Sequence, residues 1–543
     1  MSTPTRRRGA RPAAAATLAT TALLLAACSS GGTGGGSGDA STGADDDPVA
    51  GGDLRFAITV DSRCIDPQQV GNNDAIAVAR QTVASLTAQD PDTGEIVPWL
   101  AESWEVSDDA SSYTFHLREG ATYADGTPID AESVKTNFDA IVALGATASL
   151  GSQYLVGYEG TTVTDPQTLT VDFAQPSAQF LQASSTFSLG LLSPASAELT
   201  PEERCAGDYV GSGPFQVESY TQDQEIVLTK VPGYDWSSEA DEHTGEAYLD
   251  SVTYQVIPES SVRAGSLASG QIDATAAIAA VDQPQFDGNG FWLQQRANPG
   301  VAYQLFPRES SSLASDEAVR VAISKGIDRQ QIVDTVLTER DQAATGVLSH
   351  STPLAPDLGD LLAYDPDGAE QLLDDAGWVV GDDGIREKDG RRLSTTVTFW
   401  QDPAPLELVQ QQLRQIGVDL QLQHVEIAES TAIKESGDFD FDYYNLTRSD
   451  PDVLRLIFSA NARNINDRPA EEVDDLLDRS AAATDPDERA GLIEEASRLL
   501  VEHGHAIPVY ELSTTIAAAD RVHGLTFEGS SRLDFYGAWV DPS

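Results

Sequence analysis

The stretch from Gly94 to Pro128 constrains the fold of this chain most, because local signals alone predict its consecutive elements. Two runs of alternating polarity, Trp104–Val106 and Tyr113–Leu117, flank a turn sequence rich in Ser and Asp, a pattern typical of a β-hairpin. A second turn follows at Asp125-Gly126, and Asp130 is a usual N-cap residue. The stretch therefore predicts a hairpin followed by a helix.

The length and charge of the chain narrow its class. At 543 residues it is too long for one hydrophobic core, so two or three lobes are expected. The formal net charge is -53, from 86 acidic and 33 basic residues. This charge argues against nucleic acid as a partner, because a polyanion would be repelled and no basic face is evident. We interpret the acidity as a solvated surface that keeps an exported protein soluble, with salt adaptation as an open alternative.

The first 28 residues predict a targeting signal. Arginines at the start precede an apolar run, Ala13–Leu25, and the small-residue sequence Leu25-Ala26-Ala27-Cys28. This sequence resembles a bacterial lipobox, in which the cysteine is lipidated and becomes the new N-terminus. The apolar run is shorter than the ~20 residues that span a bilayer, so we expect a lipoprotein outside the cell. Residues 29–52 are mostly Gly, Ser, Thr and Asp and predict a flexible tether.

With Cys28 assigned to lipid, Cys64 and Cys205 are the remaining cysteines. In an oxidising compartment a lone pair of cysteines is more often a disulfide than two free thiols. The bridge would close a loop of well over a hundred residues, for which the chain-entropy model gives up to ~5 kcal/mol of stabilisation. We therefore predict a disulfide between them.

Further elements of the first half follow from local patterns. Asp74 predicts the N-cap of a helix that runs to Leu86, and Val163–Phe173 predicts two strands joined by an Asp-Pro turn. Gly211–Phe215 contains Gly-Ser-Gly, which could cradle an anion. A phosphate loop, however, opens a helix and carries a lysine, whereas here a strand follows. The sequence therefore favours a turn.

The second half alternates helices with strands. Asp365-Pro366 and Asp485-Pro486 each place an N-cap beside a proline at the first helical position, and Gly377 marks the end of the first of these helices. Leu406–Ile416 predicts a helix, and the alternation in Val418–Leu422 predicts a strand. This strand–helix–strand rhythm favours an α/β lobe.

No catalytic residue or cofactor is predicted. The chain lacks a Gly-x-Ser-x-Gly elbow, a His-Glu-x-x-His motif and a Cys-x-x-Cys motif. His503 and His505 could coordinate a metal. They also lie where a predicted helix ends, and a cationic or hydrogen-bonding side chain is favourable at a helix C-terminus without any metal. We therefore predict no enzyme activity.

Three alternating aspartates, Asp438, Asp440 and Asp442, mimic the first half of a calcium loop. An EF-hand would need glycine at the next position, which is Tyr443. Aromatic residues alternate with the aspartates, so a half-buried strand is the stronger interpretation. No metal site is predicted.

Six or more segments in a fixed order resemble one family. They are GGDL with IDP, GEIVPWLAESWEVSDDASSYTFHLREGATYADGTP, VGSGPFQVESY with PGYDW, LDSVTYQVIP, and VRVAISKGIDR. Together they resemble the solute-binding proteins of ABC importers in the peptide, dipeptide and nickel class, bacterial extracellular solute-binding protein family 5. The resemblance covers about Gly52 to Asp541.

The resemblance implies a two-lobed α/β fold of the periplasmic-binding-protein type, with a hinged ligand cleft and a smaller inserted domain. We expect these divisions: a signal peptide with lipobox at 1–28; a tether at 29–52; lobe I at 53–86, 208–299 and 507–543; the inserted domain at 87–207; lobe II at 300–506.

The segment ending in Asp450-Pro451 is where the resemblance places ligand specificity. In peptide binders of the family, an aspartate three residues before this Asp-Pro receives the α-ammonium group of the ligand, and Thr447 stands at that position here. Arg448 follows, and its planar, permanently charged fork suits carboxylate or phosphate. The alternative is that Arg448 pairs with Asp450 or another acid. The departure argues against ordinary free peptides.

Other positions are carried over from the family to the ligand cleft. One pair matches a strand that pairs with an extended ligand, and the rest match cleft aromatics or their neighbours. They are Ser62 and Arg63; Tyr154 and Tyr303; Trp400 and Gln401; Tyr443, Tyr444 and Asn445.

The resemblance implies a monomeric lipid-anchored protein that captures an oligopeptide or similar small solute and delivers it to ABC permease subunits. Three alternatives stay open at this point: a binder of a carboxylated or nickel-chelate solute, a sensing lipoprotein on the same fold, and an extracellular hydrolase. The missing motifs argue against the hydrolase.

Overall fold

A computed structural model describes residues 47–542, except 427–428, 430–431, 434–435 and 438. Cys28, the signal sequence and most of the predicted tether lie outside the described residues. Pro48–Ser543 forms one compact unit. None of its described helices is long and apolar enough to cross a membrane.

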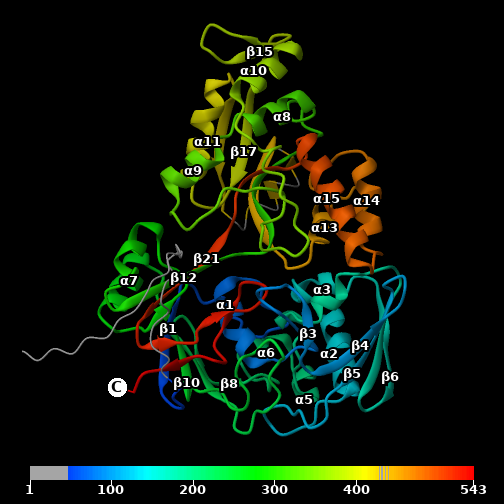
Figure 1. The fold of residues 1–543 in the computed structure, drawn as a ribbon, viewed down its shortest axis with the longest axis vertical. Helices are drawn as coiled ribbons and strands as arrows, with labels where there is room; N and C mark the ends of the chain where they lie inside the picture. Colours follow the sequence, from blue (N-terminus) through cyan, green and yellow to red (C-terminus); the bar gives the residue numbers. More distant parts are fainter. Residues whose placement is uncertain (1–46, 427–428, 430–431, 434–435, 438, 543) are drawn as a thin grey trace, which may run out of the picture. The chain divides into compact units, whose positions relative to one another are not determined.

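A seven-stranded mixed sheet forms the first lobe (Figure 1). Its order is β12 (Phe291–Ala297), β21 (Ser513–Ala519), β11 (Ala274–Thr275), β1 (Asp53–Ile58), β10 (Ser251–Val256), β9 (Glu225–Lys230) and β8 (Phe215–Thr221). Strand β1 runs parallel to β10 and β11, and the other pairs are antiparallel. The rings of Phe56 and Phe535 meet edge to face at 5.3 Å, which fastens the C-terminal segment to this sheet.

The four-stranded sheet contains the predicted hairpin. Its order is β4 (Ala101–Val106), β5 (Ser112–Leu117), β7 (Thr168–Phe173) and β6 (Tyr158–Asp165), all antiparallel. Asp130 caps helix α2 (Ala131–Leu144) through a capping box with Ser133. Phe180 packs against Tyr113 and Phe173 at 5.0 and 4.7 Å between ring centroids. The hairpin and helix predictions are therefore confirmed.

A five-stranded sheet organises the second lobe. Its order is β18 (Asp419–His424), β17 (Ser394–Phe399), β19 (Phe441–Thr447), β13 (Gly300–Pro307) and β20 (Ile507–Tyr510). Strands β17 and β18 are parallel and joined by α11 (Ala404–Gln415), which gives the predicted βαβ unit. Its other helices are α8 (Glu317–Lys325), α9 (Arg329–Val336), α10 (Pro366–Asp375), α13 (Val453–Phe458), α14 (Glu472–Ser480) and α15 (Pro486–Glu502).

The remaining described elements are short. The helices are α1 (Asn73–Ala79), α3 (Gly151–Tyr154), α4 (Phe180–Ala183), α5 (Pro194–Ala197), α6 (Pro201–Cys205) and α7 (Ser260–Ala268). The 3₁₀ turns are Arg80–Thr82, Gly145–Thr147, Phe187–Leu189 and Ala280–Phe286. The strands are β2 (Thr87–Gln89), β3 (Ile96–Pro98), β14 (Val379–Val380), β15 (Arg386–Lys388), β16 (Arg391–Arg392), β22 (Val522–His523), β23 (Thr526–Phe527), β24 (Leu533–Asp534) and β25 (Trp539–Val540).

Two short connections join the seven-stranded and five-stranded sheets, one from β12 to β13 and one from β20 to β21. Asn298 and Leu512 lie in these connections, and the Asn298 N–H donates to the Leu512 carbonyl at 2.7 Å. The sequence predicts that the last part of lobe I begins at residue 507. Strand β20 instead pairs with β13, so the return comes after Tyr510.

The helix predicted from Asp74 to Leu86 is shorter and differently capped. Asn72 is the N-cap, and the Asp74 carboxylate instead accepts hydrogen bonds from the N–H groups of Thr59 and Val60. The chain becomes extended at Val83 because the loop at 211–213 lies against it, with the Gly213 N–H donating to the Thr82 carbonyl at 3.0 Å. Tertiary contacts therefore override the helical pattern, and the Gly-Ser-Gly segment is a turn that opens strand β8.

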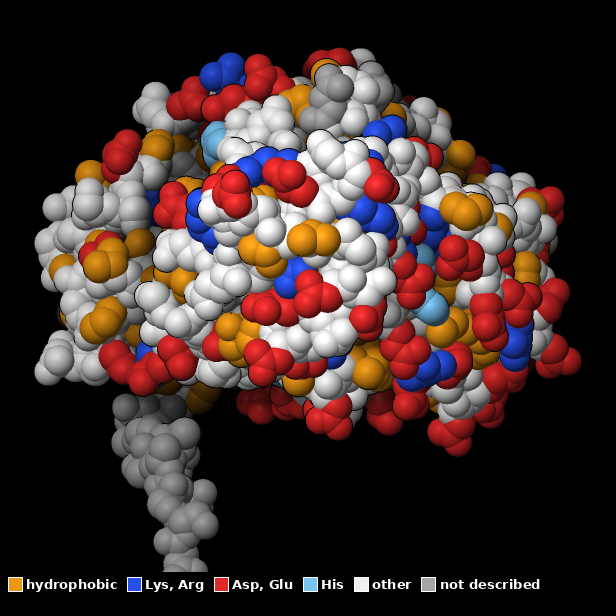
Figure 2. All heavy atoms as spheres, turned by 90° about the horizontal axis from the view of Figure 1, so that it is seen from above, with side chains coloured by type: hydrophobic (Ala, Val, Ile, Leu, Met, Phe, Trp, Pro, Cys, Tyr) orange, Lys and Arg blue, Asp and Glu red, His pale blue; other side chains and the backbone are white. Residues whose placement is uncertain are grey.

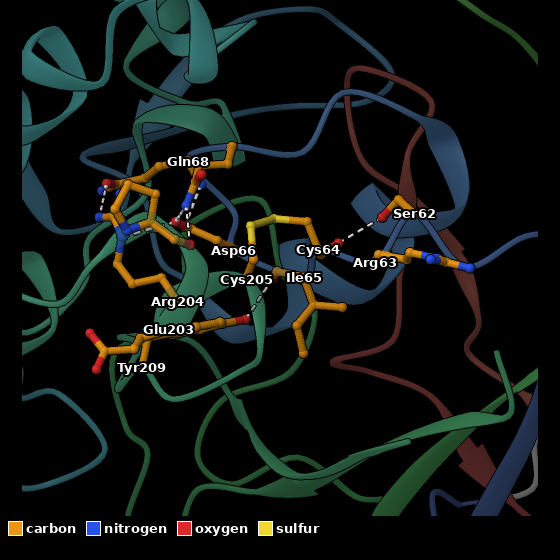
Figure 3. Close-up of a disulfide and its surroundings, with 12 residues drawn as sticks. Ser62, Arg63, Cys64, Ile65, Asp66, Gln68, Glu203, Arg204, Cys205 and Tyr209 are labelled. Atoms are coloured by element: carbon orange, nitrogen blue, oxygen red, sulfur yellow. Dashed lines mark hydrogen bonds and ion pairs between the residues drawn. A yellow bond between two sulfur atoms is a disulfide. The ribbon is translucent and has the colours of Figure 1, made fainter. Parts of the chain in front are cut away.

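Cys64 and Cys205 are joined by a disulfide (Figure 3). Beside it, the buried Arg204 guanidinium and Asp66 carboxylate form an ion pair with an N–O distance of 3.0 Å. Arg204 also donates to the Gln68 side chain at 3.0 Å. The disulfide and the ion pair together hold helix α6 against the segment that follows strand β1.

Acidic side chains are spread over the face drawn in Figure 2, with basic side chains interspersed among them. Many of the basic side chains of the described chain are ion-paired, such as Arg498 with Glu495 at 2.5 Å and Lys230 with Asp250 at 3.0 Å. Other arginines, such as the buried Arg263 and Arg329, bind neutral oxygens instead.

Candidate ligand-binding site

A cavity of about 430 Å³ is lined by side chains from both lobes. Asn73 at the start of α1 and Tyr154 at the end of α3 border it from one side. Trp400, just after β17, and Arg448, just after β19, border it from the five-stranded sheet. A cavity of this size is in the range that binds small organic ligands.

Strand topology brings the second-lobe residues together. Strands β17 and β13 both pair with β19, so residues at one end of these three strands are neighbours. Six of the residues predicted from sequence to contact a ligand line this cavity. They are Tyr154, Tyr303, Trp400, Asn445, Thr447 and Arg448.

The other five predicted residues do not line this cavity. Tyr443 is fully buried in the core of the second lobe, and Gln401 accepts a hydrogen bond from the Trp400 N–H at 3.2 Å. Tyr444 is also buried and stacks on Trp400 at 5.7 Å. It therefore supports the cavity wall from behind.

Ser62 and Arg63 lie beside the disulfide (Figure 3). The Ser62 hydroxyl donates to the Cys64 carbonyl at 2.7 Å, and the exposed Arg63 pairs with Asp223 at 3.3 Å. Neither residue lines the cavity.

Arg448 is 7% exposed and binds neutral oxygens only. Its Nη2 donates to Gln153 Oε1 at 2.6 Å and its Nη1 to the Tyr154 hydroxyl at 3.1 Å. Its guanidinium carbon also lies 4.7 Å from the centre of the Tyr154 ring, within the range of a cation–π contact. Both partners are on α3, which comes just before strand β6 of the four-stranded sheet, so Arg448 connects the second lobe to this part of the chain.

Asp450, which the sequence suggested as an ion-pair partner of Arg448, pairs with another arginine. Asp450 accepts hydrogen bonds from both Nη atoms of Arg489, at 2.6 and 2.9 Å. In the described part of the chain, no carboxylate lies within ion-pair distance of Arg448. The alternative in which Arg448 is neutralised by Asp450 is therefore wrong.

Sequence reasoning missed Arg532, which also lines this cavity. It lies between β23 and β24 and donates a hydrogen bond to Asn73 Oδ1. Burial lowers the pKa of Arg532 to about 10. Nothing in its local sequence, Ser-Ser-Arg-Leu-Asp, distinguishes it from a surface arginine.

His503 and His505, considered above as metal ligands, instead lie beside glutamates. His503 Nδ1 lies 2.9 Å from Glu317, and the buried His505 lies between Glu309 and Glu471, at 2.6 and 3.2 Å. Over the described residues, no group of three or more His, Cys, Asp or Glu side chains is arranged to hold a metal ion.

Of the alternating aspartates, Asp442 lies in strand β19, whereas Asp440 comes just before it. Asp440 accepts a hydrogen bond from the Thr396 N–H at 2.9 Å, and the buried Asp442 accepts one from the Thr398 hydroxyl at 3.2 Å. Asp438 lies outside the described residues.

A larger cavity of about 940 Å³ lies elsewhere in the first lobe. Asp241 and Asp534 line it, together with Arg80, which is already paired with Glu528 at 2.8 Å. Burial, with the nearby charge of Asp241, raises the pKa of Asp534 to about 7. Asp90, Asp92, Glu239, Glu242 and Glu528 also line this cavity, so it is acidic, unlike the cavity beside Arg448.

Residues 95–464, more than half of the chain, match the model of the middle region of bacterial extracellular solute-binding proteins, family 5. The chain belongs to this family. Members of family 5 are solute-binding proteins of ABC transporters and not enzymes.

Two curated relatives of this family 5 protein show how far the likeness extends. It is 27% identical over 460 residues to the oligopeptide-binding protein OppA of Mycobacterium tuberculosis, covering 78% of this chain and 73% of the relative. It is 26% identical over 494 residues to the glutathione-binding protein GsiB of Escherichia coli, covering 85% and 89%.

Among solved structures, this family 5 protein is similar to NikA from Brucella suis in complex with Fe(III)-EDTA. The TM-score is 0.77 at 24% identity, covering 90% of this chain and all of that one. This likeness establishes the two-lobed α/β fold of the periplasmic-binding-protein type, which confirms the predicted fold class.

Proposed function

We propose that this family 5 protein is an exported, lipid-anchored monomer that captures a small carboxylated solute, such as a short acidic peptide, and delivers it to ABC permease subunits. The observation that carries the proposal is Arg448, which lines a cavity between the lobes and has no acidic partner among the described residues. Lipid attachment at Cys28 is part of the proposal and rests on the sequence.

A buried guanidinium is costly unless an anion or several hydrogen bonds compensate it. In a chain with 86 acidic residues, partners for Arg448 are abundant, yet none of the cavity's lining residues is acidic. A ligand carboxylate would supply the missing charge. Thr447, which stands where peptide binders of the family are expected to carry an acid, supports an anionic ligand over a free α-ammonium group.

Aromatic side chains give the site its apolar surface. Tyr154, Tyr303 and Trp400 border the cavity, and Trp400 is fixed by stacking on Tyr444. Rigid aromatic walls suit ligands of varied structure that share an anionic group. Among the relatives, one is named for glutathione and another was solved with Fe(III)-EDTA, both compounds with several carboxylates.

Native mass spectrometry of protein purified from its own host tests the proposal by identifying the captured ligand. Calorimetry then compares the wild type with Arg448→Ala, using the N-acetylated tripeptide Ala-Ala-Glu as the probe, since it has no α-ammonium group. We expect Arg448→Ala to weaken binding by about tenfold or more, that is ~1.4 kcal/mol.

The matched control is Arg414→Ala, since Arg414 lies on α11 with its side chain 60% exposed. Its affinity should stay at the wild-type value. Capture of a cationic or uncharged ligand, or an unchanged affinity of Arg448→Ala, would contradict the proposal. Membrane fractionation of Cys28→Ala checks the anchor separately, because loss of the lipid should release the protein.

A further inference from the structure

We propose that Arg532 is a second anion-binding residue of this site, and that Arg448 and Arg532 together select ligands with two anionic groups. The inference rests on the proposed function, since it specifies the class of solute that the site takes. Arg532 stands next to the seven-stranded sheet, whereas Arg448 extends from the five-stranded sheet, and both line the same cavity.

Burial, with a smaller contribution from the positive charge of Arg448, lowers the pKa of Arg532. Neither has an ion pair among the described residues. Arg532 donates to the neutral Asn73 side chain, and Arg448 donates to Gln153 and Tyr154. The cavity therefore holds two positive charges that its own lining leaves uncompensated.

The nearby carboxylates are engaged elsewhere. Glu528, whose charge acts on Arg532, is 2.8 Å from Arg80 and forms an ion pair with it. Arg532 also borders a neighbouring cavity of about 380 Å³ that Asp74 lines. The Asp74 carboxylate accepts hydrogen bonds from the N–H groups of Thr59 and Val60. Neither acid is therefore an ion-pair partner of Arg532.

Both guanidinium groups keep donors for a ligand. No described acceptor takes Nε of Arg448, nor Nε and Nη2 of Arg532. Arginine forks bind carboxylates through charge-assisted hydrogen bonds, which are stronger than neutral ones. A ligand with one carboxylate can satisfy one arginine and leaves the other charge desolvated and unpaired. A ligand with two can satisfy both, so the second carboxylate adds affinity where a neutral group would not.

The experiment uses the full chain and two N-acetylated tripeptides of nearly equal size, Ala-Ala-Glu and Ala-Ala-Gln, which differ by one carboxylate and have no α-ammonium group. Calorimetry measures both against the wild type, Arg532→Gln, Arg532→Lys and Arg448→Gln. Dicarboxylates from succinate to pimelate serve as probes without a peptide scaffold, because their lengths sample different separations of the two charges.

We expect the wild type to prefer Ala-Ala-Glu by about tenfold or more. Arg532→Gln should remove this preference while the affinity for Ala-Ala-Gln changes by less than about threefold. Arg532→Lys should restore part of the preference, since it keeps the charge but loses the fork. Arg448→Gln should weaken binding of both tripeptides.

Arg521→Gln is the control, since Arg521 binds Asp273 and does not line the cavity. Circular dichroism and melting temperature verify that each variant folds, and a variant that fails is replaced by the lysine exchange at the same position. Equal affinity of the wild type for both tripeptides, with binding that still depends on Arg448, overturns this inference alone. Failure of the wild type to bind any of these anions overturns the proposed function as well.

Discussion

Both Nη atoms of Arg489 donate hydrogen bonds to the Asp450 carboxylate, with N–O distances of 2.6 and 2.9 Å. The carboxylate is thereby removed from reach of the neighbouring Arg448. Both partners are largely buried, with side chains 12% and 7% exposed. This pairing leaves Arg448 available to a ligand.

Replacing Arg489 by leucine should destabilise the protein, because it leaves the Asp450 carboxylate buried without its partner. Breaking a buried pair in this way costs about 3–5 kcal/mol. The free energy of unfolding is measured in urea. Arg479→Leu is the matched exchange, since Arg479 pairs with Asp475 on α14 with its side chain 56% exposed, and should cost about 1 kcal/mol or less. Equal effects of the two exchanges would contradict this account.

Gly300 opens strand β13 with φ of +112° and lies against the backbone that carries Arg448. A Cβ atom at this position would meet the Leu446 carbonyl and would lie 2.5 Å from the Arg448 amide nitrogen. Gly300→Ala should therefore move the end of β19, lower the melting temperature and weaken binding of Ala-Ala-Glu. Calorimetry and thermal unfolding measure the two effects.

Gly290→Ala separates backbone strain from this clash. Gly290 also has positive φ, +96°, but nothing lies within 4 Å of a Cβ there. Strain alone costs about 1–2 kcal/mol. The free energy of unfolding of Gly290→Ala should fall by only this amount. The variant should bind Ala-Ala-Glu with the affinity of the wild type. If Gly290→Ala also bound the ligand more weakly, the weaker binding of Gly300→Ala could not be assigned to the clash with β19.

Removing the disulfide through Cys64→Ala with Cys205→Ala should lower the free energy of unfolding. The two cysteines are 141 residues apart, and the chain-entropy model gives about 5 kcal/mol for such a loop. Urea unfolding of the double variant measures the loss. Intact-mass analysis of the wild type after alkylation, with and without reductant, gives an independent check. Alkylation of both cysteines without reductant would contradict the bridge.

Asp534→Asn should stabilise the protein more at alkaline than at acidic pH. The pKa of Asp534 in the folded state, raised to about 7, lies above its unfolded value, so its stability contribution is present at low pH and is lost as pH rises through about 7. In the folded state the Asp534 carboxylate is charged only above about pH 7, and asparagine removes this charge. Urea unfolding near pH 8 should show a gain of ~1 kcal/mol or more, and near pH 4 little change.

Asp108→Asn is the reference exchange for Asp534→Asn, because Asp108 is exposed in the β4–β5 turn. Its effect on the free energy of unfolding should not vary between the two pH values by more than a few tenths of a kcal/mol. A stability difference for Asp534→Asn that is the same at both pH values would show that folding does not raise the pKa of Asp534.

Elements with strong local signals were predictable from the sequence. Asp365 and Asp485 cap helices α10 and α15 with proline in the first turn, as predicted. Gly377 follows α10 with φ of +85°, a conformation that glycine adopts without cost. In these cases the structure depends on residues a few positions apart, so the pattern in the sequence is sufficient.

Long-range contacts account for the parts that the sequence did not predict. Asp74 did not cap its helix, because Asn72 took that place and Asp74 bound the end of β1. Strand β19 extends to Thr447 because it pairs with β13, a contact between residues far apart in the sequence. Arg532 reaches the cavity only through the course of the C-terminal segment, for which no local pattern exists.

The connections at Asn298 and Leu512 have a consequence for engineering the chain. All seven strands of the first sheet lie outside residues 300–510, and all five strands of the second lie inside them. Asn298 and Leu512, which flank that segment, are joined by one hydrogen bond. The second lobe is thus a module with adjacent ends, which could be exchanged for that of another family member through two short junctions without cutting a strand of the first sheet.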